Sequence, residues 1–188
     1  MNHTSFSYGD TEVVVHQGDI TKVEADVIVN AANSSLLGGG GVDGAIHRAA
    51  GPALLDACRD VRARQGKCRT GEAVITPAGN LRAKHVVHTV GPVWRGGDSG
   101  EEAQLGSCYT QSMRLAHEHG AQSIAFPAIS TGIYRFPFER AGAIALEAVL
   151  ANLHGMARVT FVLFGERDYE TFLSLLQAHP DLVSVAEA

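Results

Sequence analysis

Hydrophobic positions along this chain follow two different periods, which predict alternating strands and helices. Six short runs are apolar, often β-branched, and bounded by Gly, Pro, Asn or Asp, as expected of strands that are covered on both faces. These runs span residues 12–16, 26–30, 73–76, 85–90, 123–127 and 159–164. Between them, apolar residues recur at helical spacing. The helical stretches span residues 44–64, 105–116, 138–149 and 169–176.

The alternation of the two patterns predicts an α/β fold, a three-layer α/β/α domain with a mixed, largely parallel central sheet. We expect residues 11–178 to form that single domain. Residues 1–10 are expected to be a loosely ordered N-terminal segment, and residues 179–188 a short tail, because Pro180 ends the last helix. In such sheets a ligand binds beyond the carboxyl ends of the strands, so the loops that leave the strands matter most for function.

Charge narrows the range of partners. The 188 residues suit one domain with a sizeable core. Lys and Arg number 15 against 20 Asp and Glu, which gives a net charge of −5 and a pI of about 6.0. A protein that binds nucleic acid through its phosphates normally carries a basic patch, so nucleic acid is not expected as a general partner. Any phosphate bound here must be held mostly by neutral donors.

Cysteines and histidines give no sign of a disulfide framework or a metal. Cys58, Cys68 and Cys108 are odd in number and lack Cys-x-x-Cys spacing, so we expect reduced thiols in a cytoplasmic protein. His85 and His88 lie three apart on a predicted strand and point to opposite faces, so we expect no zinc. No run approaches about 18 apolar residues and no secretion signal is visible, so neither membrane insertion nor export is expected.

A glycine-rich loop follows the predicted strand at 26–30. Gly38 to Gly41 are four consecutive glycines, and each loses maximal entropy when the chain becomes ordered. Such a run is expected where backbone must approach a ligand closely. Here it leads through Val42 and Asp43 into a helix start, where main-chain amides favour anions. The glycines taken alone are equally consistent with a flexible surface loop.

A second loop follows the predicted strand at 123–127. Its Ser130-Thr131-Gly132 turn exposes successive amides and hydroxyls, which can form an anion-binding nest for a diphosphate. An ordinary turn with a Ser/Thr cap is the alternative for this loop alone.

The first and last predicted strands end in residues suited to adenine. Asp19 follows the first strand and could accept a hydrogen bond from an exocyclic amine, while Phe164 at the end of the last strand supplies a flat face. Taken singly, Asp19 is more often a turn residue and Phe164 a core residue.

Five segments together resemble the macrodomain family, and within it the MacroD-type branch, which includes bacterial O-acetyl-ADP-ribose deacetylases. They are Gly18-Asp-Ile-Thr21, Asp26-Val-Ile-Val-Asn-Ala-Ala-Asn33, Gly38-Gly-Gly-Gly-Val-Asp-Gly-Ala-Ile-His47, His88-Thr-Val-Gly-Pro92 and Phe126-Pro-Ala-Ile-Ser-Thr-Gly-Ile-Tyr134. The resemblance covers residues 13–176. It implies a metal-independent hydrolase without a cofactor, which deacetylates O-acetyl-ADP-ribose and removes mono-ADP-ribose from acidic side chains of proteins. We expect a monomer.

The resemblance also assigns roles at the adenine and diphosphate end. Asp19 would hold the adenine amine beside the amide of Ile20, and Phe164 would lie against the ring. The diphosphate would be wrapped by the turn that contains Ser130, Thr131, Gly132, Ile133 and Tyr134. The tyrosine of this turn would also pack against the distal ribose.

At the other end of the ligand, the resemblance places Asn33 on the distal ribose hydroxyls and Gly41, Val42 and Asp43 over the anomeric carbon. Asp43 would orient or deprotonate the attacking water, general-base chemistry worth about 10²–10⁴-fold. The sequence leaves open which carbon is attacked and whether a diphosphate-bound water is itself the base. His47 follows Asp43 by one helical turn and could support it, although such a histidine is more often a packing residue.

Three alternatives share parts of these motifs. Residues 39–44 satisfy the G-x-G-x-x-G fingerprint of dinucleotide-dependent dehydrogenases, but residues 31–38 separate them from the preceding strand. Ser130 resembles the nucleophile of a serine hydrolase with Asp168 and His179 following in order, but that histidine lies in the predicted tail. A binding module that reads ADP-ribose without cleaving it would need neither Asn33 nor Asp43. Because both are present, the enzyme is favoured.

Overall fold

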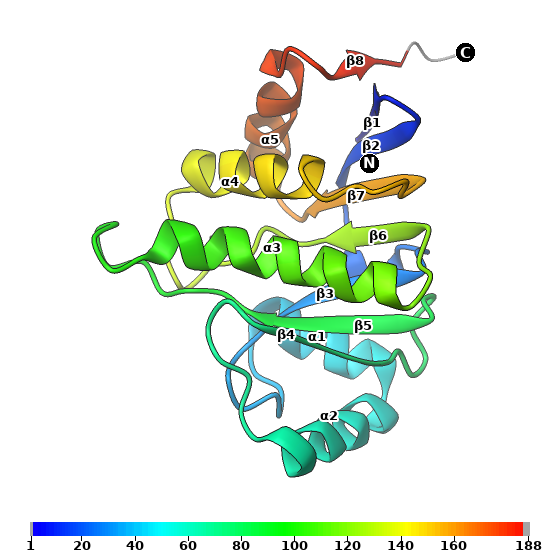
Figure 1. Ribbon diagram of the computed structural model, residues 1–188, viewed down its shortest axis with the longest axis vertical. Coiled ribbons are helices and arrows are strands. Elements are labelled where there is room, and N and C mark those ends of the chain that lie inside the picture. Colours follow the sequence, from blue (N-terminus) through cyan, green and yellow to red (C-terminus); the bar gives the residue numbers. More distant parts are fainter. Residues whose placement is uncertain (1, 186–188) are drawn as a thin grey trace.

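The computed structural model describes residues 2–185, which form a mixed eight-stranded sheet between two layers of helices (Figure 1). The strands are β1 (His3–Tyr8), β2 (Thr11–Gln17), β3 (Val27–Ala32), β4 (Ala73–Pro77), β5 (His85–Val90), β6 (Ser123–Phe126), β7 (Arg158–Leu163) and β8 (Val183–Ser184). The helices are η1 (Ile20–Lys22), α1 (Gly41–Ala50), α2 (Pro52–Gln65), α3 (Glu101–Glu118), α4 (Phe138–Leu150) and α5 (Glu166–Ala178).

The sheet has the order β4-β5-β3-β6-β7-β2-β1-β8. The five central strands, from β5 to β2, pair in parallel, and the strands outside them pair antiparallel. The predicted α/β/α architecture with a largely parallel sheet is therefore confirmed. Among residues 2–185, no helix is both long and apolar enough to cross a membrane.

Alternation along the central strands explains the two helix layers. On β3, Val27 and Val29 belong to the core under α3, α4 and α5, whereas Ile28 packs with Ile46 and Leu54 of α1 and α2 on the other face. Each apolar strand thus serves two cores, which is why its sequence is apolar without interruption.

Two boundaries differ from those expected. The helix predicted over 44–64 is two helices, because Gly51 has a φ of 81° and Pro52 opens α2, where a missing N–H costs nothing. Residues 1–10, expected to be loosely ordered, include β1, which pairs along its whole length with β2 and buries Phe6. An edge strand with one buried face carries a weaker apolar signal than a central strand.

The predicted tail at 179–188 also contains structure. Val183 and Ser184 form β8 and pair with Ser7 and Phe6 on β1, so the sheet gains one further strand at this edge. Residues 186–188 of the expected tail lie outside the described residues.

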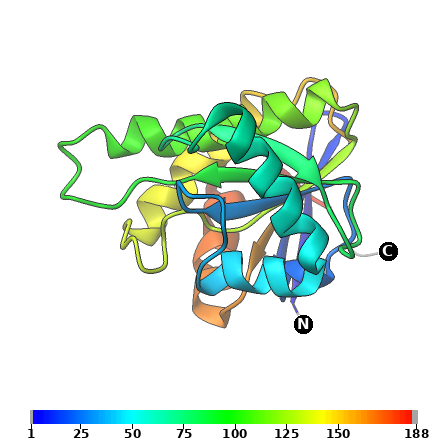
Figure 2. The same cartoon turned by 90° about the horizontal axis from the view of Figure 1, so that it is seen from below.

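The parallel strands bring the loops that leave β3, β5 and β6 to one edge of the sheet. This edge is on the left in Figure 1 and again in Figure 2, where the start of α1 also reaches it. The loops singled out in the sequence therefore converge in space, as the strand direction requires.

Candidate functional site

Exposed apolar side chains gather at this carboxyl edge. The large hydrophobic residues that remain exposed on its loops are Leu37, Val42, Val93, Ile133 and Phe164. The last two are 90% and 85% exposed, which is unusual for side chains of this size. An apolar rim around main-chain donors is typical of a surface that covers a ligand.

The glycine loop leads into α1 with its first amides uncapped. Gly40 is the N-cap residue and offers no side chain to the free N–H groups of the first turn. Gly38 and Gly41 have φ values of 91° and 58°, which glycine adopts at low cost. A Cβ on Gly44 would lie 2.5 Å from the carbonyl oxygen of Gly39, so the loop packs against the helix too closely for a side chain. Uncapped amides at a helix N-terminus favour anions, so the start of α1 is a candidate anion site.

Asp43 and Asn33, ten residues apart, meet on either side of Gly39. A Cβ on that glycine would lie 3.1 Å from Asn33 Nδ2 and 3.1 Å from Asp43 Oδ2. Asn33 is fixed because its Oδ1 accepts from the amide of Ser35 at 3.0 Å and its Nδ2 donates to the carbonyl of Gly38 at 3.0 Å. Asp43 is only 5% exposed. The pair brings an amide and a buried carboxylate to one point of the loop.

Asp43 is oriented by a neighbour that the motif analysis passed over. Its Oδ1 accepts a hydrogen bond of 2.9 Å from Nδ2 of Asn30, on the carboxyl half of β3. His47 Nε2 lies 3.4 Å from the same oxygen but without hydrogen-bond geometry. The second oxygen, Oδ2, is the one that faces Gly39 and the loop. One carboxylate oxygen is therefore anchored in the core and the other is turned toward the glycine loop.

The loop after β6 is held in a conformation that suits a nest of donors. Ser130 has a φ of 67° and is buried, and its hydroxyl finds no hydrogen-bond partner within residues 2–185. Two hydrogen bonds close the turn. Thr131 Oγ1 donates to the carbonyl of Ala128 at 2.8 Å, and the amide of Phe136 donates to the main-chain carbonyl of Ser130 at 2.9 Å. A buried hydroxyl without a partner is costly and is expected where a ligand completes the contact.

Tyr134 connects this loop to the loop that follows β5. Together with Asn33 and Gly91 it lines a cavity of about 320 Å³ under the loop that follows β5. The carbonyl of Tyr134 also accepts from the amide of Trp94 at 2.8 Å, which ties the two loops together. Gly132 and Ile133 lie exposed at the tip.

Asp19 and Phe164 come together at the far end of the same edge. The amide of Gly18 donates a hydrogen bond to the carbonyl of Leu163 at 2.9 Å, so the next residues along the chain, Asp19 and Phe164, are neighbours. Asp19 caps η1, which begins at the buried Ile20. Its Oδ1 accepts from the hydroxyl of Thr21 at 2.7 Å and from the amide at 2.9 Å. The hydroxyl hydrogen bond, more than any other contact, lowers the pKa of Asp19, which stays an ionised acceptor.

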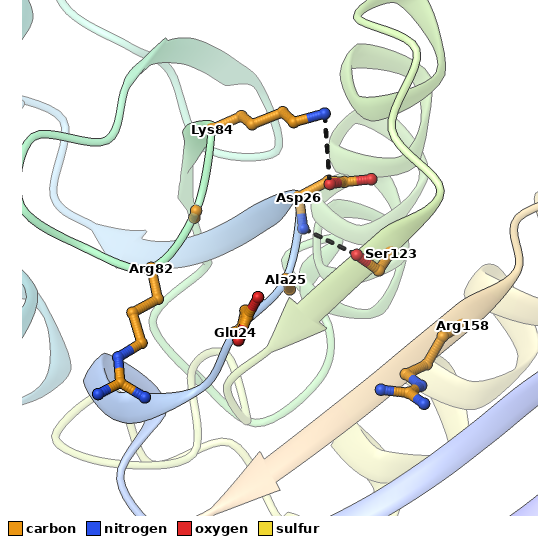
Figure 3. A pocket seen from close by; sticks show the side chains of 8 residues that line it. Glu24, Ala25, Asp26, Arg82, Lys84, Ser123 and Arg158 are labelled. Carbon is orange, nitrogen blue, oxygen red and sulfur yellow. Dashed lines mark hydrogen bonds and ion pairs between the residues drawn. The ribbon is translucent and has the colours of Figure 1, made fainter.

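Size alone would point to a different place. A larger cavity of about 590 Å³ lies where β3, β6 and β7 begin, at the opposite edge of the sheet (Figure 3). Three of its charged groups, Asp26, Lys84 and Arg158, already have partners. Lys84 Nζ lies 3.7 Å from Asp26 Oδ1, and Arg158 lies 3.4 Å from Glu12. Because uncapped amides and a buried carboxylate occur at the carboxyl edge instead, the chemistry places the candidate site there.

Comparison with known proteins agrees with this geometry. The profile of the family described as Macro domain matches residues 29–145. The chain belongs to the macrodomain family. An O-acetyl-ADP-ribose deacetylase of Escherichia coli strain K12 is 55% identical to this macrodomain over 174 residues, which cover 91% of this chain and 98% of the relative. A Shigella flexneri relative of the same name is equally similar. The resemblance drawn from the five segments is confirmed.

Solved structures match this macrodomain over most of its length. The Oceanobacillus iheyensis macrodomain with ADP has a TM-score of 0.89 and 42% identity, and the match covers 94% of this chain and 95% of that one. The Trypanosoma brucei macrodomain in complex with ADP-ribose has a TM-score of 0.78 and 42% identity, with 87% and 68% of the two chains covered.

The macrodomain also brings together three potential metal ligands that sequence spacing did not reveal. Ligand atoms of His47, Cys58 and His88 lie within 4.8 Å of one another. Both ring nitrogens of His88 lie within hydrogen-bond distance of other groups. Burial, and then the charge of Asp43, raises the pKa of the Cys58 thiol to about 11, so the thiolate that a metal needs is scarce at neutral pH. These contacts favour a hydrogen-bonded core, and the absence of a metal stays a prediction.

The serine-hydrolase alternative finds no support in the geometry. The hydroxyl of Ser130 lacks a hydrogen-bond partner in the described part of the chain, so it has no base. His179 instead lies 3.9 Å from Glu147 on α4.

Glu101, the first residue of α3, is a buried carboxylate that the sequence analysis missed. Its Oε2 accepts from the amides of Arg95 at 3.0 Å and Gly97 at 2.8 Å, and its Oε1 accepts from the amide of Ser99. Burial alone would raise the pKa of Glu101, but these main-chain hydrogen bonds bring it below the ordinary 4.5. The Glu101 carboxylate thereby holds the loop between β5 and α3, which borders the cavity that Asn33 also lines.

We expect Glu101→Gln to destabilise the macrodomain at neutral pH and not in acid. A lowered carboxyl pKa contributes stability that is present above the pKa of the unfolded chain and is lost as pH falls through the folded value. The difference in urea midpoint between the wild type and the variant should therefore be largest near neutral pH and should shrink below pH 4.5. A difference that stays constant into acid would contradict this assignment.

Proposed function

We propose that this macrodomain binds ADP-ribose at the carboxyl edge and hydrolyses its esters. The proposed substrates are O-acetyl-ADP-ribose and mono-ADP-ribose attached to acidic side chains of proteins. The observation that carries the proposal is the buried Asp43 carboxylate beside Asn33, at an uncapped helix start. The deacetylase name of relatives that are 55% identical over most of the chain supports it.

In the proposed complex, the ligand lies along the edge in one direction. Adenine is placed between Asp19 and Phe164, the diphosphate on the amides of 130–134 and of the α1 start, and the distal ribose between Asn33 and Tyr134. Neutral N–H groups and hydroxyls then hold the diphosphate. This agrees with the net charge of −5, because charges more than about 8 Å from the diphosphate are largely screened at physiological salt, so the local donors decide binding.

The proposed reaction is water attack on the ester with Asp43 as general base. Oδ2 of Asp43 takes a proton from the water as the water oxygen bonds to the electrophilic carbon. Asp43 then returns this proton to the oxygen of the broken bond, which leaves. Asn33 holds the ribose hydroxyls so that the ester bond lies near Oδ2. Hydrolysis in ¹⁸O-labelled water tells the two electrophiles apart. Labelled acetate means attack on the acyl carbon, and unlabelled acetate means attack on the sugar carbon.

The test of the function uses the purified chain and both esters. We expect release of ADP-ribose from O-acetyl-ADP-ribose and from a protein that is mono-ADP-ribosylated on Glu or Asp, followed by chromatography. If the chain binds ADP-ribose in calorimetry yet releases nothing from either ester, it is a reader module and the proposed activity is wrong.

Phe164→Ala should weaken ADP-ribose binding without destabilising the fold. The ring is 85% exposed, so its removal leaves no cavity, whereas loss of base stacking costs about 1–3 kcal/mol, or about 5- to 150-fold in Kd. Isothermal titration calorimetry measures the change. Val183→Ala, which trims another exposed apolar side chain on β8, is the matched control and should leave Kd unchanged. Equal affinity of wild type and Phe164→Ala would remove Phe164 from the site.

A further inference from the structure

A chain of hydrogen bonds runs from Asp43 into the sheet through residues to which the proposed mechanism gives no role. Asn30 on β3 is the register partner of His88 on β5, and both are fully buried. Nδ2 of Asn30 lies 2.9 Å from Asp43 Oδ1 and 3.1 Å from His88 Nδ1. Nε2 of His88 lies 3.0 Å from Oγ1 of Thr76 on β4, whose hydroxyl donates to the carbonyl of Pro77 at 3.0 Å. Four side chains thus link the carboxylate to a main-chain oxygen.

The positions of the protons along this series of hydrogen bonds follow from the groups at its two ends. The Asp43 carboxylate can only accept, so the amide of Asn30 must present nitrogen to it. The second hydrogen of the same Nδ2 points to Nδ1 of His88, which must therefore be an unprotonated acceptor. The ring proton then sits on Nε2 and is donated to Thr76, whose own proton is already directed to Pro77. Nε2 of His88 also lies 3.6 Å from Sγ of Cys58, a weak acceptor, so only the tautomer protonated on Nε2 satisfies every contact.

The surroundings of His88 keep it in that state. Burial, and then the charge of His47, lowers the pKa of His88 to about 3, so the ring is neutral at physiological pH. The other tautomer would place an N–H of His88 against the NH₂ of Asn30. The amide would then flip and turn its oxygen toward the Asp43 carboxylate, which is repulsive.

The arrangement also leaves one polar atom without a partner. Oδ1 of Asn30 is buried and makes no hydrogen bond in the part of the chain that the structure describes. Such an atom is destabilising in a protein interior. The amide nevertheless keeps this orientation, because only in this orientation does Nδ2 reach Asp43 and His88 together.

We infer that Asn30 and His88 are positioning residues for the catalytic carboxylate. Neutral His88, protonated on Nε2, fixes the amide of Asn30, and that amide anchors Oδ1 of Asp43 so that Oδ2 faces the substrate. Neither residue touches the ligand in this scheme. The inference rests on the proposed function, since it needs Asp43 to be the base.

The protonation state can be tested without any catalysis. In the uniformly ¹⁵N-labelled macrodomain, long-range nitrogen–proton spectra should show His88 protonated on Nε2, with no titration between about pH 5 and 8. A ring protonated on Nδ1, or a ring that titrates in this range, overturns the inference whatever the enzyme assays give.

Kinetics of two variants test the effect on Asp43. His88→Leu removes the acceptor for Asn30 and should lower kcat for O-acetyl-ADP-ribose about tenfold, with KM and the Kd of ADP-ribose little changed. His88→Gln can accept from Asn30 and donate to Thr76 through its own amide, so it should recover most of the lost kcat. If the role of His88 were purely structural, the substitutions would change the Tm, and His88→Leu and His88→Gln would not differ in kcat alone.

A matched control lies on the same strand. His85 stacks edge-on against His119 at 5.0 Å between ring centroids and takes no part in the chain to Asp43, so His85→Leu should keep the wild-type kcat. If Asp43→Ala is slow while folded His88→Leu keeps the wild-type kcat, the positioning role is wrong and the proposed function stands. If Asp43→Ala is as fast as wild type, the proposed base is wrong and the positioning role falls with it. The spectra then still report the protonation of His88.

Discussion

Replacing Asp43 with alanine is expected to slow hydrolysis of O-acetyl-ADP-ribose by about 10²–10⁴-fold, the usual contribution of a positioned general base. The carboxylate is buried, its Oδ1 is anchored by Asn30, and its Oδ2 faces the glycine loop next to Asn33. Initial rates of acetate release at saturating substrate measure the effect.

Asp43→Asn is the sharper companion variant. It keeps the size of the side chain and an oxygen that can accept from Asn30, but it cannot take a proton from water. We expect it to bind ADP-ribose nearly as well as wild type and to be as slow as Asp43→Ala. If Asp43→Asn turns over at the wild-type rate, the base lies elsewhere, and a water held by the substrate's diphosphate becomes the explanation.

The second large effect is expected at Gly91, directly after β5. A Cβ there would lie 2.6 Å from Cγ2 of Ile129 and would collide with the hydroxyl of Ser130. Ile129 is buried and cannot move aside. Gly91→Ala should therefore displace the 130–134 loop, and a misplacement of about 1 Å can cost about 10²-fold. We expect kcat/KM for O-acetyl-ADP-ribose to fall by about that factor and the Kd of ADP-ribose in calorimetry to rise.

Gly106→Ala provides the control for the same substitution. Gly106 lies within α3, and a Cβ there would meet only Ile144 Cγ2 at 3.7 Å, an ordinary contact. It should leave ligand affinity unchanged and should raise stability by about 0.5–1 kcal/mol, because alanine is the better helix former. Unchanged affinity in folded Gly91→Ala would show that the Ser130 turn is not part of the binding site.

The core of the fold was predictable from the sequence because the central strands are buried on both faces. A run such as Val27 to Val29 feeds two cores and must be apolar throughout, so it is visible without any knowledge of its neighbours. The strand β1 was missed because it covers only one face, and the break between α1 and α2 was missed because apolar periodicity continues across Gly51. Local sequence patterns predict which residues are buried better than they predict where the chain changes direction.

The candidate site divides in the same way. Asn33, Ser130 and Asp19 lie on loops with unusual composition, Asp43 lies in the first turn of the helix that follows such a loop, and the sequence singled them out. Asn30 stands in a buried strand, where its position gave no sign of a partner. Its link to His88, 58 residues away, appears only when β3 and β5 pair in parallel with these two residues in register.

The sequence by itself determined the family, the layer architecture and the residues whose chemistry suits a diphosphate, a ribose and a base. These depend on local features: apolar period, glycine content and the functional group of each side chain. Only the tertiary structure decided which oxygen of Asp43 is anchored, which nitrogen of His88 carries the proton, and that Glu101 shapes the neighbouring loop. The physical reason is that hydrogen bonds depend on distances of about 3 Å between atoms far apart in the chain, and strand register sets those distances.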